Sequence, residues 1–470
     1  MLSSKIPVRL LIAACALAIA TPVFAQTDGV LTRQYDDGGI YEGEFRDGLQ
    51  HGEGTYRLPN GFEYTGEWVA GEISGQGVAR YPSGAVYEGA FTEGRPHGRG
   101  LMIFADGSSY DGDWVDGRIE GQGERRFAND SVFLGSFVDG QPQGQGVLTR
   151  PDGYVYDGAW VAGLREGQGR ITYPDGAVYE GEMRADQRHG TGVLTNPDGL
   201  RYEGEWAEGQ LHGQGELRQP NGDVYTGQFR AGLRHGEARV EQADGLVFEG
   251  NFVDDLRDGQ GRLSGPDGYL YEGTWVAGQI AGAGRLEQPD GSVYEGDFRA
   301  GLPDGTGTIT YADGASYEGE WREGQFHGQG RAVFADGAVY EGSFIQGLSD
   351  GQGVMTFADE RVYTGSFAGG ELHGQGEMVY PDGSLYQGQF NEGAREGLGR
   401  IELADGFVYE GEWSGGQITG TGIATYATGD VYEGEFLDGQ RHGRGVLRYA
   451  TGEVLSGDWE AGRMTVRDDD

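Results

Sequence analysis

The sequence predicts an all-β protein, an elongated and twisted antiparallel meander or solenoid of tandem β-hairpins. A pattern that begins with an aromatic residue recurs every 23 residues from Tyr41 to Leu455, which gives 19 copies with no insertion or deletion. Within each copy, apolar and polar residues alternate with the period of two that is typical of a strand. Dipeptides such as Asp336-Gly337 favour tight turns between these segments. A fixed period over this many copies indicates that each unit buries its apolar face against its neighbours.

The first 25 residues are predicted to be a cleaved secretory signal peptide. Basic residues precede an apolar run over residues 10–20, and Ala25 stands before the polar Gln26. This run is shorter than the roughly 20 residues that a transmembrane helix needs, and no later stretch approaches that length. We therefore expect an exported protein, periplasmic or extracellular, that begins at Gln26.

A lipid anchor at Cys15 is the second interpretation of the same segment. Residues 12–15 resemble a lipoprotein box, in which the cysteine carries lipid after cleavage. It ranks second because apolar residues continue past Cys15 to Ala20. Cys15 is the only cysteine of the chain, so a chain that begins at Gln26 contains no disulfide and relies on the packing of its repeats.

The charge of the chain argues against two classes of partner. The net charge is −40, and removal of residues 1–25 takes away two bases and no acid, which leaves −42. A field of this sign repels phosphate backbones and anionic lipid surfaces. Nucleic acid is therefore not expected as a partner, whereas contact with a membrane stays open.

Each copy is predicted to form one hairpin, here numbered from its leading residue at position 0 to position +22. In the copy that begins at Tyr317, alternation places Tyr317, Gly319 and Trp321 on one face of a strand and Glu318 and Glu320 on the other. A glycine loop at +7, a second strand that begins near the glycines at +11 and +13, and the Asp-Gly turn at +19 and +20 complete the hairpin.

Glycine occupies three strand positions almost without exception. Position +2 is Gly in all 19 copies, +11 in all but Val466, and +13 in all but Ala238 and Asp468. Because glycine weakens a strand unless something approaches its backbone closely, the rings at 0 and +4 are expected to lie over these glycines. A phosphate-binding loop is not indicated, because no helix start follows.

These residues carry a family resemblance. The motif of Tyr202 to Gly215, Tyr-Glu-Gly-Glu-Trp-x-x-Gly-x-x-His-Gly-x-Gly, resembles the MORN (membrane occupation and recognition nexus) repeat, and the likeness covers residues 39–462. It leaves an N-terminal lead over residues 26–38 and an acidic tail over residues 463–470. The resemblance implies a rod or half-pipe of hairpins with roles in membrane-proximal scaffolding, self-association and lipid binding. Some members also carry a lipid kinase, for which the lead and tail leave no room.

A few copies depart from the pattern. Met183 replaces the aromatic at +4, Asp186 and Asp255 replace the glycine at +7, and Asp130 and Glu360 replace the turn glycine at +20. A turn that needs positive φ is strained by any residue other than glycine. Irregular connections are therefore expected in the copies that begin at Tyr110, Tyr179 and Tyr340.

Histidines and carboxylates repeat along the chain without forming a reactive cluster. All eight histidines stand at +10, and consecutive ones are expected roughly 9 to 10 Å apart, too far for one tetrahedral metal. They are His51, His97, His189, His212, His235, His327, His373 and His442. They are interpreted as structural loop residues, and the acids at +1 and +3 as a solvated row rather than a glycosidase pair. Weak calcium binding by that row stays open. No catalytic, cofactor or metal residues are predicted.

Tryptophan marks alternate copies. All eight tryptophans stand at +4 and are candidate binding or packing aromatics: Trp68, Trp114, Trp160, Trp206, Trp275, Trp321, Trp413 and Trp459. In these copies position +9 is mostly apolar, as in Ile73, Ile119, Ile280 and Ile418. We predict that the +9 side chain contacts the tryptophan of its own hairpin.

Taken together, the sequence favours a non-catalytic, exported repeat scaffold that mediates protein-protein interaction or self-association in the cell envelope. Uniform repeats make long surfaces with equivalent sites, and aromatic residues supply contact area wherever their covering is incomplete. The alternative is a lipid- or glycan-binding module that uses an aromatic groove. An enzyme is less well supported, because the copies that depart from the repeat supply no acid-base set.

Overall fold

A computed structural model of the chain describes residues 30–467. This part contains 39 β-strands. It has no helix long and apolar enough to cross a membrane. The predicted signal peptide, its cleavage before Gln26, the alternative anchor at Cys15 and residues 468–470 lie outside the described residues. The chain divides into two compact units, one up to Gly190 and one from Thr191, and β15 (Gln187–Thr195) spans the division.

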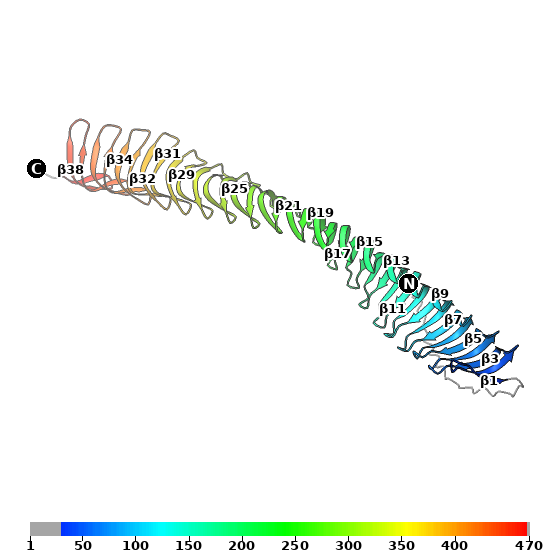
Figure 1. The fold of residues 1–470 in the computed structure, drawn as a ribbon. Helices are drawn as coiled ribbons and strands as arrows, with labels where there is room; N and C mark the ends of the chain where they lie inside the picture. Colours follow the sequence, from blue (N-terminus) through cyan, green and yellow to red (C-terminus); the bar gives the residue numbers. More distant parts are fainter. Residues whose placement is uncertain (1–29, 468–470) are drawn as a thin grey trace, which may run out of the picture. The chain divides into compact units, whose positions relative to one another are not determined.

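The first unit contains fourteen complete strands (Figure 1). They are β1 (Leu31–Gln34), β2 (Ile40–Arg46), β3 (Leu49–Arg57), β4 (Glu63–Val69), β5 (Glu72–Arg80), β6 (Val86–Thr92), β7 (Arg95–Ile103), β8 (Ser109–Val115), β9 (Arg118–Arg126), β10 (Val132–Val138), β11 (Gln141–Thr149), β12 (Val155–Val161), β13 (Leu164–Thr172) and β14 (Val178–Arg184).

In the second unit, strands of seven and nine residues alternate from β16 to β38, and the five-residue β39 follows. They are β16 (Arg201–Ala207), β17 (Gln210–Arg218), β18 (Val224–Arg230), β19 (Leu233–Glu241), β20 (Val247–Val253), β21 (Leu256–Ser264), β22 (Leu270–Val276), β23 (Gln279–Glu287), β24 (Val293–Arg299), β25 (Leu302–Thr310), β26 (Ser316–Arg322), β27 (Gln325–Val333), β28 (Val339–Ile345), β29 (Leu348–Thr356), β30 (Val362–Ala368), β31 (Glu371–Val379), β32 (Leu385–Asn391), β33 (Ala394–Glu402), β34 (Val408–Ser414), β35 (Gln417–Thr425), β36 (Val431–Leu437), β37 (Gln440–Arg448), β38 (Val454–Glu460) and β39 (Arg463–Arg467).

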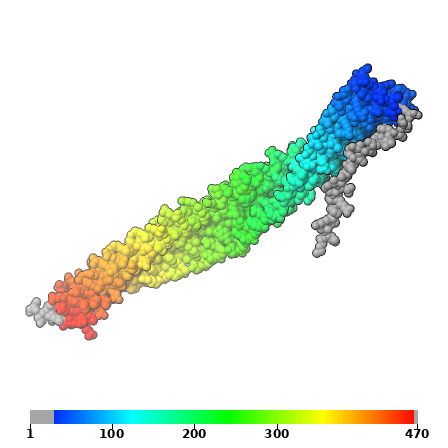
Figure 2. All heavy atoms as spheres, turned by 90° about the horizontal axis from the view of Figure 1, so that it is seen from below, coloured from blue at the N-terminus to red at the C-terminus, as the bar shows by residue number. Residues whose placement is uncertain are grey.

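Within each unit every strand pairs antiparallel with the next one along the chain, which confirms the predicted hairpin meander. In the hairpin of β26 and β27, Tyr317 stands opposite Ala332 and Trp321 opposite Phe326, with a shift in register after Gly319. The next copy pairs in the same way, with β27 against β28. Because each hairpin contacts only its neighbours, the sequence colours follow one another along the surface of each unit (Figure 2).

Two different turns connect the strands. Positions +6 and +7 both have positive φ, 50° at Glu323 and 79° at Gly324, as a two-residue type I′ hairpin turn requires. At the other end, the N–H groups of Phe334 and Gly337 bond the carbonyls of Ala338 and Phe334, at 2.8 and 2.9 Å. Gly337 has φ 89°, which confirms the positive φ predicted for the Asp-Gly turn.

The expected irregular connections are absent from the described copies, so that prediction was wrong. Asp130 and Glu360 take φ of 62° and 67° in place of the turn glycine. Their N–H groups keep the usual bonds, to Phe127 and Phe357 at 3.0 and 2.9 Å. Asp186 and Asp255 likewise keep positive φ at +7. The pairing on both sides of each turn holds these residues in the left-handed region, which an L-residue reaches with some strain.

The core of each unit is a row of rings packed edge to face. The ring of Tyr317 lies 5.3 Å from that of Trp321 in its own hairpin and 5.0 Å from that of Phe344 in the next. A Cβ added at Gly330 would meet the Tyr317 ring at 2.5 Å, so the ring fills the space of the missing side chain. This confirms the predicted role of the glycine at +13, and a Cβ at Gly319, at +2, would also meet the Tyr317 hydroxyl. For the glycine at +11 the prediction was wrong, because Gly328 has φ 58° and its added Cβ would meet the Glu320 carboxylate rather than a ring.

The +9 residues lie where predicted, and they also contact a second ring that the sequence analysis missed. Each of Ile73, Ile119, Ile280 and Ile418 stands directly opposite the tryptophan of its own hairpin and is half-buried. Phe326 shows the full environment, because it stacks on Tyr317 at 3.8 Å and also contacts Trp321 and, in the next copy, Phe344. A tryptophan therefore meets the +9 residue of the preceding copy as well.

The +9 residue of the copy before each tryptophan copy has its own sequence pattern. It is always Gln, Pro or Arg: Gln50, Pro96, Pro142, Arg188, Arg257, Pro303, Arg395 and Arg441. The guanidinium of Arg395 lies 4.2 Å from the Trp413 ring, and that of Arg441 lies 4.3 Å from the Trp459 ring. A planar cation over an indole face is a favourable cation–π arrangement.

Both ends of the array extend further than the sequence analysis placed them. Arg463–Arg467, assigned to the tail, form β39, and Met464 stands opposite Trp459 of β38. β1, assigned to the lead, pairs with β2 from Leu31 opposite Gly43. These end strands satisfy backbone groups of β38 and β2 that would otherwise face solvent as open edges.

Candidate interaction surface

The eight tryptophans belong to the core and not to the surface. Their side chains are between 3% and 6% exposed. Seven of them donate the indole N–H to the carbonyl of the glycine at +13 in the preceding copy, as Trp321 does to Gly307 at 3.0 Å. Rings covered in this way offer little contact area to a partner.

The opposite face of the hairpins is hollowed in the second unit. A groove of about 1180 Å³ runs over consecutive copies from Gln352 to Gly434. The glycine pairs at +2 and +13, such as Gly388 opposite Gly399, form its floor. Side chains at +1, +12 and +14 form its walls, and among them Leu398 and Ile423 are 65% and 45% exposed. A shorter groove of the same construction lies between Glu249 and Arg285.

The carboxylates on this face have two different roles, which corrects the interpretation of a uniformly solvated row. Five of those at +1 pair with an arginine at +14 of the preceding copy, as Glu295 does with Arg285 at 2.8 Å. Because both partners are exposed, such a pair adds little stability. Those at +3 accept a backbone N–H that the register shift releases, as Glu320 does from Gln329 at 3.0 Å. The +3 acids therefore help to hold the hairpin.

The histidine position closes the turn of the next copy. The N–H groups of Ala70 and Asp116 lie 3.5 Å from Nδ1 of His51 and His97. In another copy, Glu166 at +10 accepts the N–H of Ala185 at 2.9 Å. This confirms the interpretation of +10 as a structural loop position. Residues 30–467 contain no group of three or more metal-ligating side chains, and the weak calcium binding stays a prediction.

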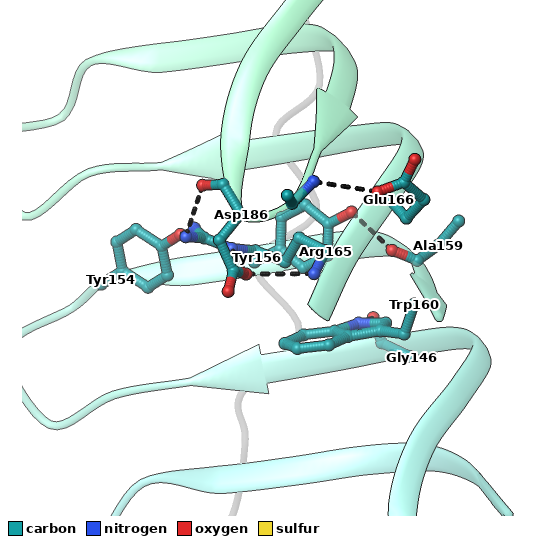
Figure 3. A network of polar contacts seen from close by, with 9 residues as sticks. Gly146, Tyr154, Tyr156, Ala159, Trp160, Arg165, Glu166 and Asp186 are labelled. Atoms are coloured by element: carbon teal, nitrogen blue, oxygen red, sulfur yellow. Dashed lines mark hydrogen bonds and ion pairs between the residues drawn. The ribbon is translucent and has the colours of Figure 1, made fainter. Parts of the chain in front are cut away.

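One polar network was missed by the sequence analysis (Figure 3). Asp186 at +7 accepts the backbone N–H and the Nε–H of Arg165, at 3.0 and 2.8 Å, and its carbonyl accepts the Nη2–H at 2.9 Å. The Tyr154 hydroxyl also bonds the guanidinium. Arg234 and Asp255 repeat this arrangement in the second unit. The signal is a spacing of 21 residues between Arg at +9 and Asp at the next +7.

The fold and surface define a β-hairpin repeat protein with an open groove, and the family is shown by comparison. The profile of the MORN repeat matches eighteen segments, and the chain belongs to the MORN repeat family. The matched residues are 41–62, 64–86, 87–109, 110–132, 133–153, 156–178, 179–201, 202–224, 225–247, 248–268, 271–293, 294–316, 317–339, 340–360, 363–385, 386–408, 409–431 and 432–454. The structure adds a nineteenth hairpin, made of β38 and β39.

Similarity to individual proteins is local. Alsin of Rattus norvegicus and of Homo sapiens are each 46% identical to this chain over 55 residues, which is 11% of this chain and 3% of Alsin. The chain thus matches only a small part of these relatives.

Among solved structures, the TCP domain of SAS-4 from Drosophila melanogaster is 17% identical with a TM-score of 0.23, over 34% of this chain and 89% of that domain. Virginiamycin B lyase from Staphylococcus aureus is 13% identical with a TM-score of 0.11, over 61% of this chain and 92% of the lyase. Scores this low support no argument about function.

Proposed function

We propose that this chain is a non-catalytic scaffold that binds protein partners in the cell envelope through the groove over Gln352 to Gly434. The observation that carries the proposal is the groove itself, which presents the same wall and floor positions copy after copy. Equivalent sites on neighbouring copies let weak contacts add through effective concentration. The partner would be an extended segment, because the groove follows the direction in which the repeats stack.

Charge and exposed apolar groups indicate the chemistry of that partner. The net charge of −40 favours a segment with basic side chains and makes association sensitive to salt. The exposed Leu398 and Ile423 give apolar contacts that screening does not weaken. Self-association is the nearest variant. No observation favours the lipid or glycan alternative, because the aromatic residues on which it depends are buried.

The groove is tested with a partner captured from envelope extract by the chain of residues 26–470 and then purified. We expect the double variant Leu398→Glu, Ile423→Glu to weaken binding at least tenfold in a titration. Val276, which is 54% exposed and lies outside both grooves, provides the control Val276→Glu. Equal affinity of the two variants would exclude the groove as the binding surface. Turnover of a small substrate by the purified chain would contradict the non-catalytic assignment.

Export is a separate part of the proposal. A mature chain that begins at Gln26 without lipid is the expected product of the N-terminal segment. Mass spectrometry of the protein isolated from its native host measures this terminus directly. A diacylated chain that begins at Cys15 would instead make the protein membrane-anchored.

A further inference from the structure

A cavity of about 240 Å³ opens in the second unit on the aromatic side of the hairpins. Its lining includes Arg234, Asp255, Arg257 and Gln242, together with Val240 and Leu256. The cavity lies between the copies that begin at Tyr225 and Phe248 and shares no residue with either groove. It therefore gives the molecule a site separate from the proposed interaction surface.

The two arginines of the cavity differ in their partners. Arg234 is paired, because its Nε and Nη2 groups bond the carboxylate and the carbonyl of Asp255, each at 3.0 Å. The guanidinium of Arg257 lies over the rings of Phe248 and Trp275, at 4.5 and 4.8 Å from their centroids. Within residues 30–467 it has neither a hydrogen bond nor an ion pair to an acceptor. Arg257 thus presents a free donor fork beside the cavity.

Neighbouring copies show which partners Arg257 lacks. The +7 residue of the next copy is Asp after Arg165 and Arg234, but it is Gly278 after Arg257. Where that residue is also glycine, Arg395 and Arg441 bond its carbonyl, at 2.7 and 2.9 Å.

The side chain that covers the guanidinium differs as well. Tyr426, at +17 of the preceding copy, lies 6.0 Å from the guanidinium of Arg441. Gln242 holds the corresponding position beside Arg257 and lines the cavity. The smaller amide side chain accounts for the space in front of the Arg257 donor fork.

Electrostatics favour an anion in this space. Burial lowers the pKa of the Arg257 guanidinium, and the charge of Arg234 adds to the effect. A half-buried cation beside a second cation gains from an anionic partner, because removal of a charge from water is unfavourable until that charge is paired.

We propose that this cavity binds a small carboxylate whose two oxygens accept the donor fork of Arg257. The planar guanidinium matches the geometry of a carboxylate. A monoanion is favoured over phosphate, because Asp223 and Asp255 also line the cavity and repel a second negative charge. Val240 and Leu256 suit a short apolar body. The volume is below that of pockets for larger ligands, which hold roughly 300 to 1,000 Å³.

Benzoate is the probe, titrated into the full chain by isothermal calorimetry. Arg257→Gln removes the donor fork and places at +9 the residue that Gln50 provides in the first copy. Gly278→Asp keeps Arg257 and gives it an aspartate partner within the chain. Asp186 is such a partner for Arg165, and Asp255 is the partner for Arg234. We expect each variant to weaken benzoate binding at least about tenfold, the effect of losing one charge-assisted contact.

The matched controls change the pair of Arg441 and Gly462, in which the guanidinium already donates to the glycine carbonyl. Arg441→Gln and Gly462→Asp change the same two repeat positions elsewhere and should leave the affinity for benzoate within about twofold of that of the unaltered chain. Thermal melting of all four variants checks that they fold. Absence of benzoate binding by the unaltered chain, retention of binding by folded Arg257→Gln, or binding of benzamide or phosphate as tight as that of benzoate would overturn the proposal.

Discussion

The contact between a ring and a bare glycine backbone is the basic interaction of the core. Tyr317 lies over Gly330, and its hydroxyl donates to the carbonyl of Glu320 at 2.7 Å, so a buried polar group is satisfied within the same hairpin. The copy that begins at Tyr225 has Ala238 at the glycine position. There the rings of Tyr225 and Phe229 meet at 65°, compared with 85° for Tyr317 and Trp321. An added methyl group is accommodated by tilting the ring.

The first prediction concerns this contact. Gly330→Ala should lower the free energy of unfolding by roughly 1 to 3 kcal/mol, because the new Cβ overlaps the Tyr317 ring. Urea denaturation followed by tryptophan fluorescence measures the change. Ala238→Gly is the matched control and should be neutral or stabilising. A Gly330→Ala chain as stable as the unaltered one would show that the ring shifts without penalty.

The second prediction concerns alkaline pH. Burial raises the pKa of Tyr317 to about 12, and it raises those of Tyr340, Tyr363 and Tyr409 to about 12 as well. A tyrosine in the unfolded chain titrates near about 10. The unfolded state therefore loses protons first, so the stability from these groups is complete below about pH 10 and is lost as the pH rises toward 12.

The melting temperature should therefore fall between about pH 10 and 12. The ultraviolet absorbance of tyrosinate in the folded chain should rise only above the pH at which it rises in urea. Coincident titration curves for the folded and unfolded chains would contradict this prediction.

At the scale of the hairpin, the turns and the register show how far sequence patterns reach. Alternation and Asp-Gly turns predicted two strands per copy, because they depend on residues close together in the sequence. The partner of Arg165 was not predicted, because Asp186 stands 21 residues away in the next copy and reaches it only through the pairing of strands. The contact between Arg395 and Trp413 was missed for the same reason.

The third prediction tests this coupling between adjacent hairpins. Asp186→Gly removes the strain of a positive φ but also the partner of Arg165, so we expect the single change to be destabilising by about 1 kcal/mol or less. In a double-mutant cycle with Arg165→Leu, the coupling energy should be about 0.5 to 1.5 kcal/mol, because the Arg165 side chain is only 19% exposed. Urea denaturation of the four chains measures it, and additivity would mean that the network adds no stability.

At the scale of the whole molecule, the residues at +9 and at the next +4 vary together, which favours a pair of copies as the unit of packing where Trp and Phe alternate. A tryptophan copy is preceded by Gln, Pro or Arg at +9, and each phenylalanine copy that follows a tryptophan copy is preceded by an apolar residue. The alternation of Trp and Phe is visible in the sequence. Which ring each +9 residue meets is not, since that depends on the shift in register within the hairpin.

The fourth prediction follows from this pairing of copies. Deletion of residues 294–339 removes two whole copies and places Ile280 before Phe344. A phenylalanine at +4 then still follows Ile280, as Phe298 does in the unaltered chain. Deletion of residues 294–316 removes one copy and places Ile280 against Trp321, where Pro303 now stands.

Repeat stability is roughly a sum of terms within copies and between neighbours, so a mismatched junction should add its own penalty. We expect the shorter deletion to lower the denaturation midpoint more than the longer one, by an amount equivalent to about 1 kcal/mol. Restoring proline in the shorter chain with Ile280→Pro should recover part of the loss, because Pro303 occupies the same place before Trp321. If the midpoint instead falls in proportion to the number of copies removed, the single copy is the unit of packing.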